Sequence, residues 1–130
     1  MYSKIILSQS NNVLEDGLLQ TYEIYNMRLN ANLTVLSGCN SGIGELKRGE
    51  GLIGMRRAFL YAGVPSIVVS LWPVEDESTA ILMKQFYKYL NAGYIKKTAL
   101  QKAKIDLIKS KDKKRDPFYW APFVLIGDGN

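Results

Sequence analysis

Apolar residues along the chain occur in short runs that are separated by turn residues and by helical stripes. The run at Ser66–Trp72 is apolar throughout its middle, which is typical of a strand covered on both faces of a parallel sheet. A shorter run at Leu33–Leu36 predicts a second buried strand. Two further strands are predicted at Lys4–Leu7 and Phe123–Ile126.

Helical spacing of apolar residues fills most of the intervals between these runs. The predicted helices are, in chain order, Leu18–Tyr25, the stripe Leu52, Met55, Phe59 and Ala62, the stripe Met83, Phe86, Tyr87 and Leu90 after a cap at Asp76, and the stripe Leu100, Ala103 and Leu107. Strands that alternate with helices of this length predict βαβ units and a parallel sheet. We therefore expect residues 1–130 to form one α/β domain.

The composition is that of an ordinary globular domain, with 47% hydrophobic and 11% aromatic residues. The longest apolar stretch, around Ile67–Trp72, is too short to span a bilayer, and no signal-like segment opens the chain. A single cysteine excludes an internal disulfide, and the absence of histidine argues against a zinc site. We expect a cytoplasmic protein without membrane contact, and no cofactor or metal.

The net charge of +5 belongs to one segment of the chain. Residues 96–116 hold nine lysines and arginines against Asp106, Asp112 and Asp116, which gives +6 and leaves about −1 for the rest. Such a run is usually a solvated helix face and loop. A nucleic-acid-binding surface is the alternative interpretation, and it rests on this segment alone.

Cys39 is the one cysteine, and it lies between the predicted strand Leu33–Leu36 and the glycines Gly42 and Gly44. Open α/β folds place their chemistry at the carboxyl ends of strands. Cys39 is thus a candidate nucleophile, although a buried single cysteine is most often a small core residue. A thiol attacks as the thiolate, and histidine, its usual base, is absent from the chain.

The stretch from Val35 to Gly44, with the sequence VLSGCNSGIG, resembles the cysteine motif of CHAT domains, caspase-like proteases that are often coupled to TPR repeats. Further segments resemble the family in the same order along the chain, namely residues 16–24, 49–63, 69–79 and 120–128. Gly38 replaces the family's usual alanine before the cysteine. The resemblance covers essentially the whole chain, so it is more specific than the cysteine motif alone.

This resemblance implies a caspase-haemoglobinase-like three-layer sandwich, with a mainly parallel sheet flanked by helices. It implies Cys39 as the nucleophile, with its own backbone N–H as a candidate oxyanion donor. The family's histidine lies well before the cysteine. Counted back from Cys39, the position of that histidine falls at or before residue 1 of this chain. We therefore expect this chain to be the C-terminal part of the domain, with the catalytic base outside it.

By the same resemblance, the end of the second long strand binds the substrate peptide by β-augmentation, through Ser70, Leu71 and Trp72. Gly38, directly before the nucleophile, belongs to the same substrate-binding set. The alternative for Ser70–Trp72 is the plain end of a core strand.

Three carboxylates are candidates for selecting a basic substrate side chain, because a carboxylate matches the bidentate geometry of a guanidinium. They are Asp16, Glu75 and Asp76. The alternatives are structural, since Asp16 is a natural turn residue and Asp76 a natural helix cap.

The predicted function is a cysteine endopeptidase that acts by acyl transfer. The expected partners are a protein or peptide substrate, the upstream histidine-bearing half of the domain, TPR repeats, and a second copy bound through an exposed edge of the Cys39 strand. The alternative is a pseudo-protease that keeps the fold and serves as a protein-interaction module.

Overall fold

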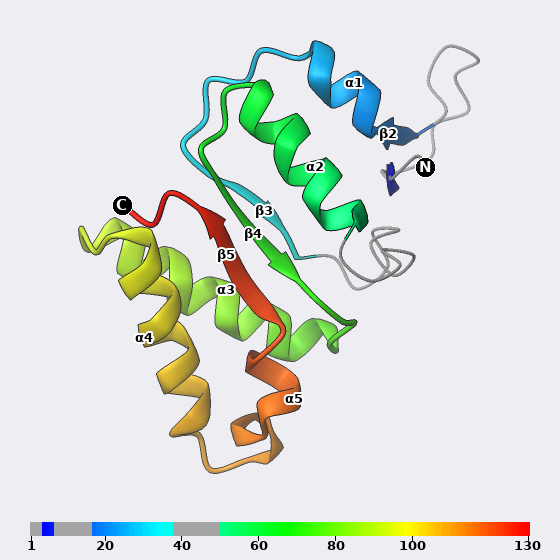
Figure 1. Cartoon of the computed structure of the whole chain (residues 1–130). Helices are drawn as coiled ribbons and strands as arrows, with labels where there is room; N and C mark the ends of the chain where they lie inside the picture. Colours follow the sequence, from blue (N-terminus) through cyan, green and yellow to red (C-terminus); the bar gives the residue numbers. More distant parts are fainter. Residues whose placement is uncertain (1–3, 7–16, 38–49) are drawn as a thin grey trace.

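The computed structural model of the chain describes residues 4–6, 17–37 and 50–130 (Figure 1). Its strands are β1 (Lys4–Ile6), β2 (Leu18–Gln20), β3 (Thr34–Leu36), β4 (Ser66–Ser70) and β5 (Phe123–Gly127). Its helices are α1 (Thr21–Asn26), α2 (Glu50–Tyr61), α3 (Asp76–Asn91), α4 (Lys96–Ile108), the short 3-10 helix η2 (Lys113–Arg115) and α5 (Pro117–Trp120). The predicted α/β class is confirmed.

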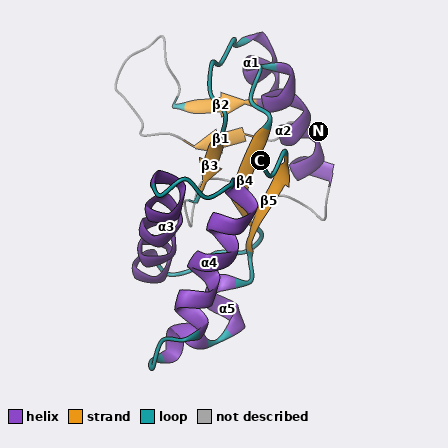
Figure 2. Ribbon diagram, turned by 90° about the vertical axis from the view of Figure 1, so that its left-hand side faces the viewer, coloured by secondary structure: helices purple, strands orange, loops and turns teal. Residues whose placement is uncertain are grey.

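A three-stranded sheet in the order β3–β4–β5 has helices on both of its faces (Figures 1 and 2). Side chains alternate along β4, so that Val68 enters a buried cluster with α3 and α4. Ile67 and Val69 enter a second buried cluster with α1 and α2. The first four residues of β4 are buried, which confirms the prediction of a strand covered on both faces.

The described sheet is only half parallel, because β3 pairs with β4 in parallel and β5 pairs with β4 in antiparallel fashion. The prediction of a mainly parallel sheet is wrong for these strands. The physical reason is that two long helices connect β4 to β5. α3 carries the chain back to the start of β4, where Lys96 of α4 donates from Nζ to Ser66 Oγ at 2.9 Å. α4 then carries the chain to the opposite end of the sheet, where β4 ends, so β5 runs antiparallel to β4.

The predicted helix at Leu18–Tyr25 is in fact a strand followed by a helix. Its first part is β2, which pairs antiparallel with β1 in a separate two-stranded sheet. The Gln20 backbone N–H donates to Glu23 Oε2 at 2.6 Å, and this cap starts α1 at Thr21. Pairing with β1, which is distant in sequence, therefore overrides the local helical spacing of Leu18 and its neighbours.

The stripes predicted for α2 and α4 are confirmed in all the side chains that the structure describes. The buried members are Met55 and Phe59 of α2, Ala62 directly after it, and Leu100, Ala103 and Leu107 of α4. The side chain of Leu52 lies outside the description. Among the helices that are described, none has the length and apolar character needed to cross a membrane.

α3 departs from its predicted stripe in one position and from its predicted cap in another. Met83 and Phe86 are buried, but Tyr87 is 46% exposed. Tyr87 follows Phe86 directly and so points about 100° around the helix from it. The helix cap is Glu75, and Asp76 is the first helical residue.

β3 is half-buried, and the prediction of a buried strand is wrong at this point. Among the described strands it pairs with β4 alone, so it forms one edge of the sheet. An edge strand offers unpaired N–H and C=O groups to another chain. The predicted association with a second copy of the chain therefore has a candidate surface, but the association itself stays a prediction.

We expect the chain to self-associate through the β3 edge as its concentration rises. Light scattering over a concentration series measures the association, and Thr34→Lys is expected to reduce it because a charged side chain on an edge strand opposes pairing. A monomer of unchanged mass at all concentrations, in the unsubstituted chain, would contradict the prediction.

Candidate functional site

Because β3 and β4 run parallel, with Leu36 opposite Val69, their carboxyl ends lie together. They meet at the edge of the sheet that is made by strand ends, which is not the lateral edge made by β3. Ser37, the residue after β3, and Ser70, the last residue of β4, therefore lie at the same edge. Ligands of open α/β sheets bind at such an edge, beyond the carboxyl ends of the strands.

Three of the predicted site residues lie outside the described residues. They are the nucleophile Cys39, its neighbour Gly38, and the selector Asp16. Cys39 follows Leu36, the last residue of β3, by three positions in the sequence. The other predicted members, Ser70, Leu71 and Trp72 and the carboxylates Glu75 and Asp76, are described.

The end of β4 exposes apolar side chains at this edge. Leu71 is 52% exposed and Trp72 is 38% exposed. The Leu71 backbone N–H donates to Pro122 O at 3.0 Å, which prolongs the pairing with the segment before β5. Ser70 Oγ donates to Trp72 O at 2.6 Å and fixes the first turn of the chain after the strand.

Trp72 has a partner that the sequence analysis missed. Its indole Nε1–H donates to Phe118 O at 3.0 Å, and the two rings lie 6.3 Å apart between centroids at 33°. Phe118 belongs to α5, which begins at Pro117 after the cap Asp116. This Asp-Pro pair is the sequence signal that could have predicted a helix start just before the last strand.

Ion pairs join the start of α3 to η2. Lys113 Nζ lies 3.0 Å from Glu75 Oε2, and Lys114 Nζ lies 3.3 Å from Glu77 Oε1. The hydrogen bond from Lys113, and then that from Ser78, hold the pKa of Glu75 below its usual value. Glu75 is thus already engaged within the chain, and its selection of a basic substrate side chain stays a prediction.

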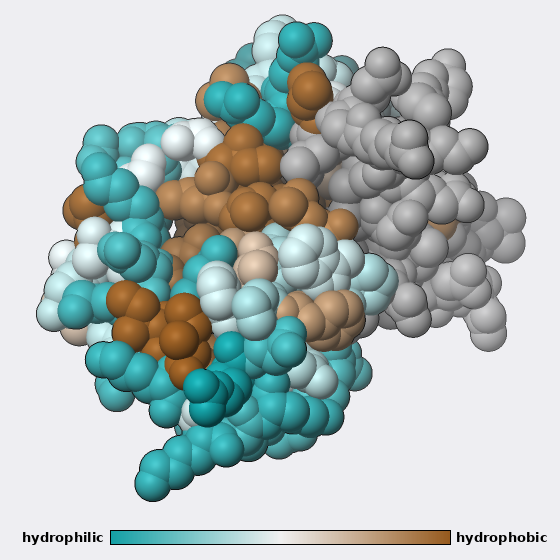
Figure 3. Space-filling view, turned by 60° about the horizontal axis from the view of Figure 1, so that its bottom comes forward, coloured by the Kyte–Doolittle hydropathy of each residue, from teal (hydrophilic) through white to brown (hydrophobic). Residues whose placement is uncertain are grey.

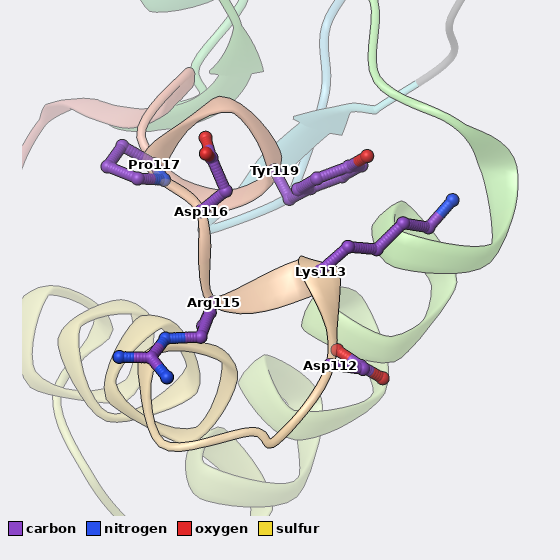
Figure 4. Close-up of a pocket in the computed structure, with 6 residues that line it drawn as sticks. All are labelled: Asp112, Lys113, Arg115, Asp116, Pro117 and Tyr119. Atoms are coloured by element: carbon purple, nitrogen blue, oxygen red, sulfur yellow. The ribbon is translucent and has the colours of Figure 1, made fainter.

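An open hollow of about 670 Å³ lies beside this junction. It is lined by Asp112, Lys113, Arg115, Asp116, Pro117 and Tyr119. Figure 4 shows Lys113 and Tyr119 directed to one side and Arg115 to the other. The Lys113 Nζ lies 5.6 Å from the Tyr119 ring centroid, so its charge is shared between this ring and Glu75.

Much of the positive charge of residues 96–116 is used inside the fold. Lys114 is buried and pairs with the exposed carboxylates of Asp112 and Glu77, and Lys102 lies over the rings of Tyr89 and Tyr94. A hydrogen bond to Asp106 raises the pKa of Tyr89, with burial adding to it. These contacts favour the interpretation of a structural, solvated helix face over a nucleic-acid surface. Within the described ranges, no three His, Cys, Asp or Glu side chains gather into a metal site.

Trp72→Ala is expected to weaken peptide binding far more than it destabilises the fold. The ring is 38% exposed, and truncation of a fully buried aromatic would cost about 3–5 kcal/mol. We expect the loss in free energy of unfolding to stay below about 2 kcal/mol, because a partly exposed ring loses less packing. Thermal unfolding measures it. A loss within the larger range would assign Trp72 to the core.

Comparison with known proteins agrees with the sequence resemblance. The family model described as "CHAT domain" matches residues 1–128. The chain is 32% identical over 114 residues to Tetratricopeptide repeat protein 28 of mouse, and 32% identical over 114 residues to the human protein of that name. These alignments cover 88% of the chain but only 5% and 4% of the two relatives. No solved structure matches the chain significantly.

Proposed function

The chain belongs to the CHAT domain family, generally caspase-like, and on this premise we propose that it carries the nucleophile and the peptide-binding edge of a cysteine endopeptidase. The observation that supports this most is the parallel pairing of β3 with β4, with Leu36 opposite Val69. It brings the strand that leads to Cys39 and the strand that leads to Trp72 to one edge of the sheet.

Chain length supports the same assignment of roles. Cys39 lies three positions beyond Leu36, and three extended residue steps span at most about 11 Å. A peptide laid across the ends of β3 and β4 is within reach of a thiol tethered this closely. The helices on both faces of the sheet are compatible with a caspase-haemoglobinase-like sandwich, which we propose as the fold family.

The proposed mechanism is acyl transfer. The Cys39 thiolate adds to the peptide carbonyl carbon, the C–N bond breaks as the amine leaves with a proton, and water then hydrolyses the thioester. The backbone N–H of Cys39 is the proposed donor to the oxyanion, with Gly38 directly before it in the substrate-binding set. The chain contains no histidine, so we place the proposed histidine base outside these 130 residues.

The substrate side of the proposal uses the end of β4. Ser70, Leu71 and Trp72 would receive the peptide as an added strand, and Asp16 would select a basic side chain. A protein or peptide is the proposed substrate, in a cytoplasmic setting and without a cofactor.

A second candidate function follows from the absence of histidine. Without its base, the same edge would bind a peptide and not cleave it, as a protein-interaction module does. The two relatives are named for tetratricopeptide repeats, so we propose TPR repeats as partners of this chain under either function.

A peptidyl acyloxymethyl ketone tests the proposed site, with iodoacetamide as the reagent that lacks a peptide. Because Cys39 is the single cysteine, intact mass measures its labelling directly, and Cys39→Ser is the control. We expect the ketone to label Cys39 at least about tenfold faster, relative to iodoacetamide, than it labels free cysteine, since binding at the edge concentrates the reagent near the thiol. An equal ratio for protein and free cysteine would contradict the peptidase proposal, in which Cys39 and the peptide-binding edge form one site.

A further inference from the structure

Phe118 lies where a bound peptide would meet the edge of the sheet. We propose that Phe118 is a specificity-determining residue, and that it forms with Trp72 an aromatic platform for one apolar side chain of the bound peptide. This inference rests on the proposed function, because it deepens the peptide-binding role assigned to the end of β4.

The strand register brings the two aromatic residues together from distant parts of the chain. β4 and β5 are antiparallel, with Ser70 opposite Phe123. The segment that leaves β4 and the segment that enters β5 therefore lie side by side, and the Leu71 N–H donates to Pro122 O at 3.0 Å between them. Trp72 stands on the first segment and Phe118 on the second.

The contact between the rings leaves apolar surface open. Phe118 is 51% exposed and Trp72 is 38% exposed, with their centroids 6.3 Å apart. The one polar atom of the indole is satisfied by Phe118 O, so the exposed part of both rings has no hydrogen bond to offer. Single exposed aromatics are common, but two in contact at the edge that ends β4 form a small apolar site.

The segment that carries Phe118 is held firmly before any ligand binds. Asp116 Oδ1 accepts from the Phe118 N–H at 2.9 Å, and the Ala121 N–H donates to Pro117 O at 2.8 Å. The Lys113–Glu75 ion pair ties the same segment to the start of α3. A preorganised platform loses little conformational freedom on binding, which favours affinity.

The charges of the two segments favour an uncharged side chain as the occupant. Glu75 is paired with Lys113, and an oxygen of Asp116 is bonded to the backbone. Arg115 points away from Tyr119, the neighbour of Phe118 (Figure 4). Figure 3 brings the bottom of Figure 1 forward and shows a largely hydrophilic face with apolar residues gathered over parts of it. The chemistry therefore fits an aromatic or branched aliphatic side chain.

Capped tetrapeptides test this proposal by NMR of the Trp72 indole N–H. In one series, a single phenylalanine replaces each alanine of a tetra-alanine peptide in turn. In the matched series, a single aspartate does so. At one position at least, we expect the phenylalanine peptide to shift the Trp72 resonance in a saturable way and the aspartate peptide to leave it in place. Phe118→Ala is expected to weaken this binding about three- to tenfold, and Phe118→Leu to retain most of it.

Two controls separate the platform from the rest of the account. Tyr61→Ala removes a 77% exposed ring from α2, on the other face of the sheet, and should leave binding unchanged. The second control is the labelling of Cys39 by the peptidyl ketone, which tests the peptidase proposal separately from the platform. If Cys39 shows no peptide-directed labelling while the Trp72 resonance still shifts, the peptidase proposal fails and the platform stands.

Three results would overturn the platform. The first is unchanged affinity in Phe118→Ala when its melting temperature shows it to be folded. The second is that the phenylalanine and aspartate series bind equally well, or that neither series binds. The third is a Trp72 resonance that moves with protein concentration alone, which would assign the surface to a second copy of the chain.

Discussion

We expect the rate of peptide hydrolysis by this 130-residue chain to be no higher than the rate measured for its Cys39→Ala variant. Catalytic residues that act together lose about 10⁴-fold or more in rate when one is missing, and the chain has no histidine to serve as the base. A free thiol is only a few per cent ionised at neutral pH, so Cys39 alone supplies little nucleophile.

A fluorogenic peptide pool measures this turnover, with matched protein concentrations of the chain and of Cys39→Ala. Measurable hydrolysis that Cys39→Ala abolishes would contradict the account, because it would show that Cys39 is activated within this chain. In that case the N-terminus of α2, which follows Cys39 along the chain, would be the first feature to examine as the source of activation.

Gly127→Ala is expected to destabilise the fold by about 3 kcal/mol or more. Gly127 ends β5 opposite Ser66 at φ 102°, a conformation that side chains of L-residues rarely adopt. An added Cβ would lie 2.1 Å from Pro65 O, so the backbone at the start of β4 would have to move. The free energy of unfolding from urea titration measures the loss.

Two other glycines separate strain from crowding in this prediction. Gly93 has φ 89° and nothing within 4 Å of an added Cβ, so Gly93→Ala should cost only the strain of about 1 kcal/mol. Gly54 lies within α2 with open space around it, and Gly54→Ala should stabilise by about 0.5–1 kcal/mol. An effect of Gly127→Ala no larger than that of Gly93→Ala would mean that the close approach to Pro65 is not rigid.

The sequence predicts well those parts of the fold in which local pattern and tertiary contact agree. The buried run of β4 and the stripes of α2 and α4 were predicted because each shows its periodicity clearly and each is covered as that periodicity requires. Tyr87 shows the limit of this reasoning, because one residue beside a buried position turns to solvent.

The parts that could not be predicted depend on contacts between distant segments. The strand β2 has a helical pattern, and only its pairing with β1 makes it a strand. The direction of β5 depends on how α3 and α4 pack together, which no local pattern encodes. Phe118 joins the candidate site because β5 lies beside β4, and nothing in its own neighbourhood indicates a role near Trp72.

Proximity of Cys39 to Trp72 is the central claim, and bimane fluorescence measures it most directly. Bimane coupled to Cys39, the single cysteine, is quenched by a tryptophan side chain that it can touch. The account predicts strong quenching that Trp72→Phe relieves and that Trp120→Phe, the matched control at the other tryptophan, leaves unchanged. Fluorescence that is the same in the unsubstituted chain and in Trp72→Phe would contradict the claim that the thiol and the end of β4 form one site.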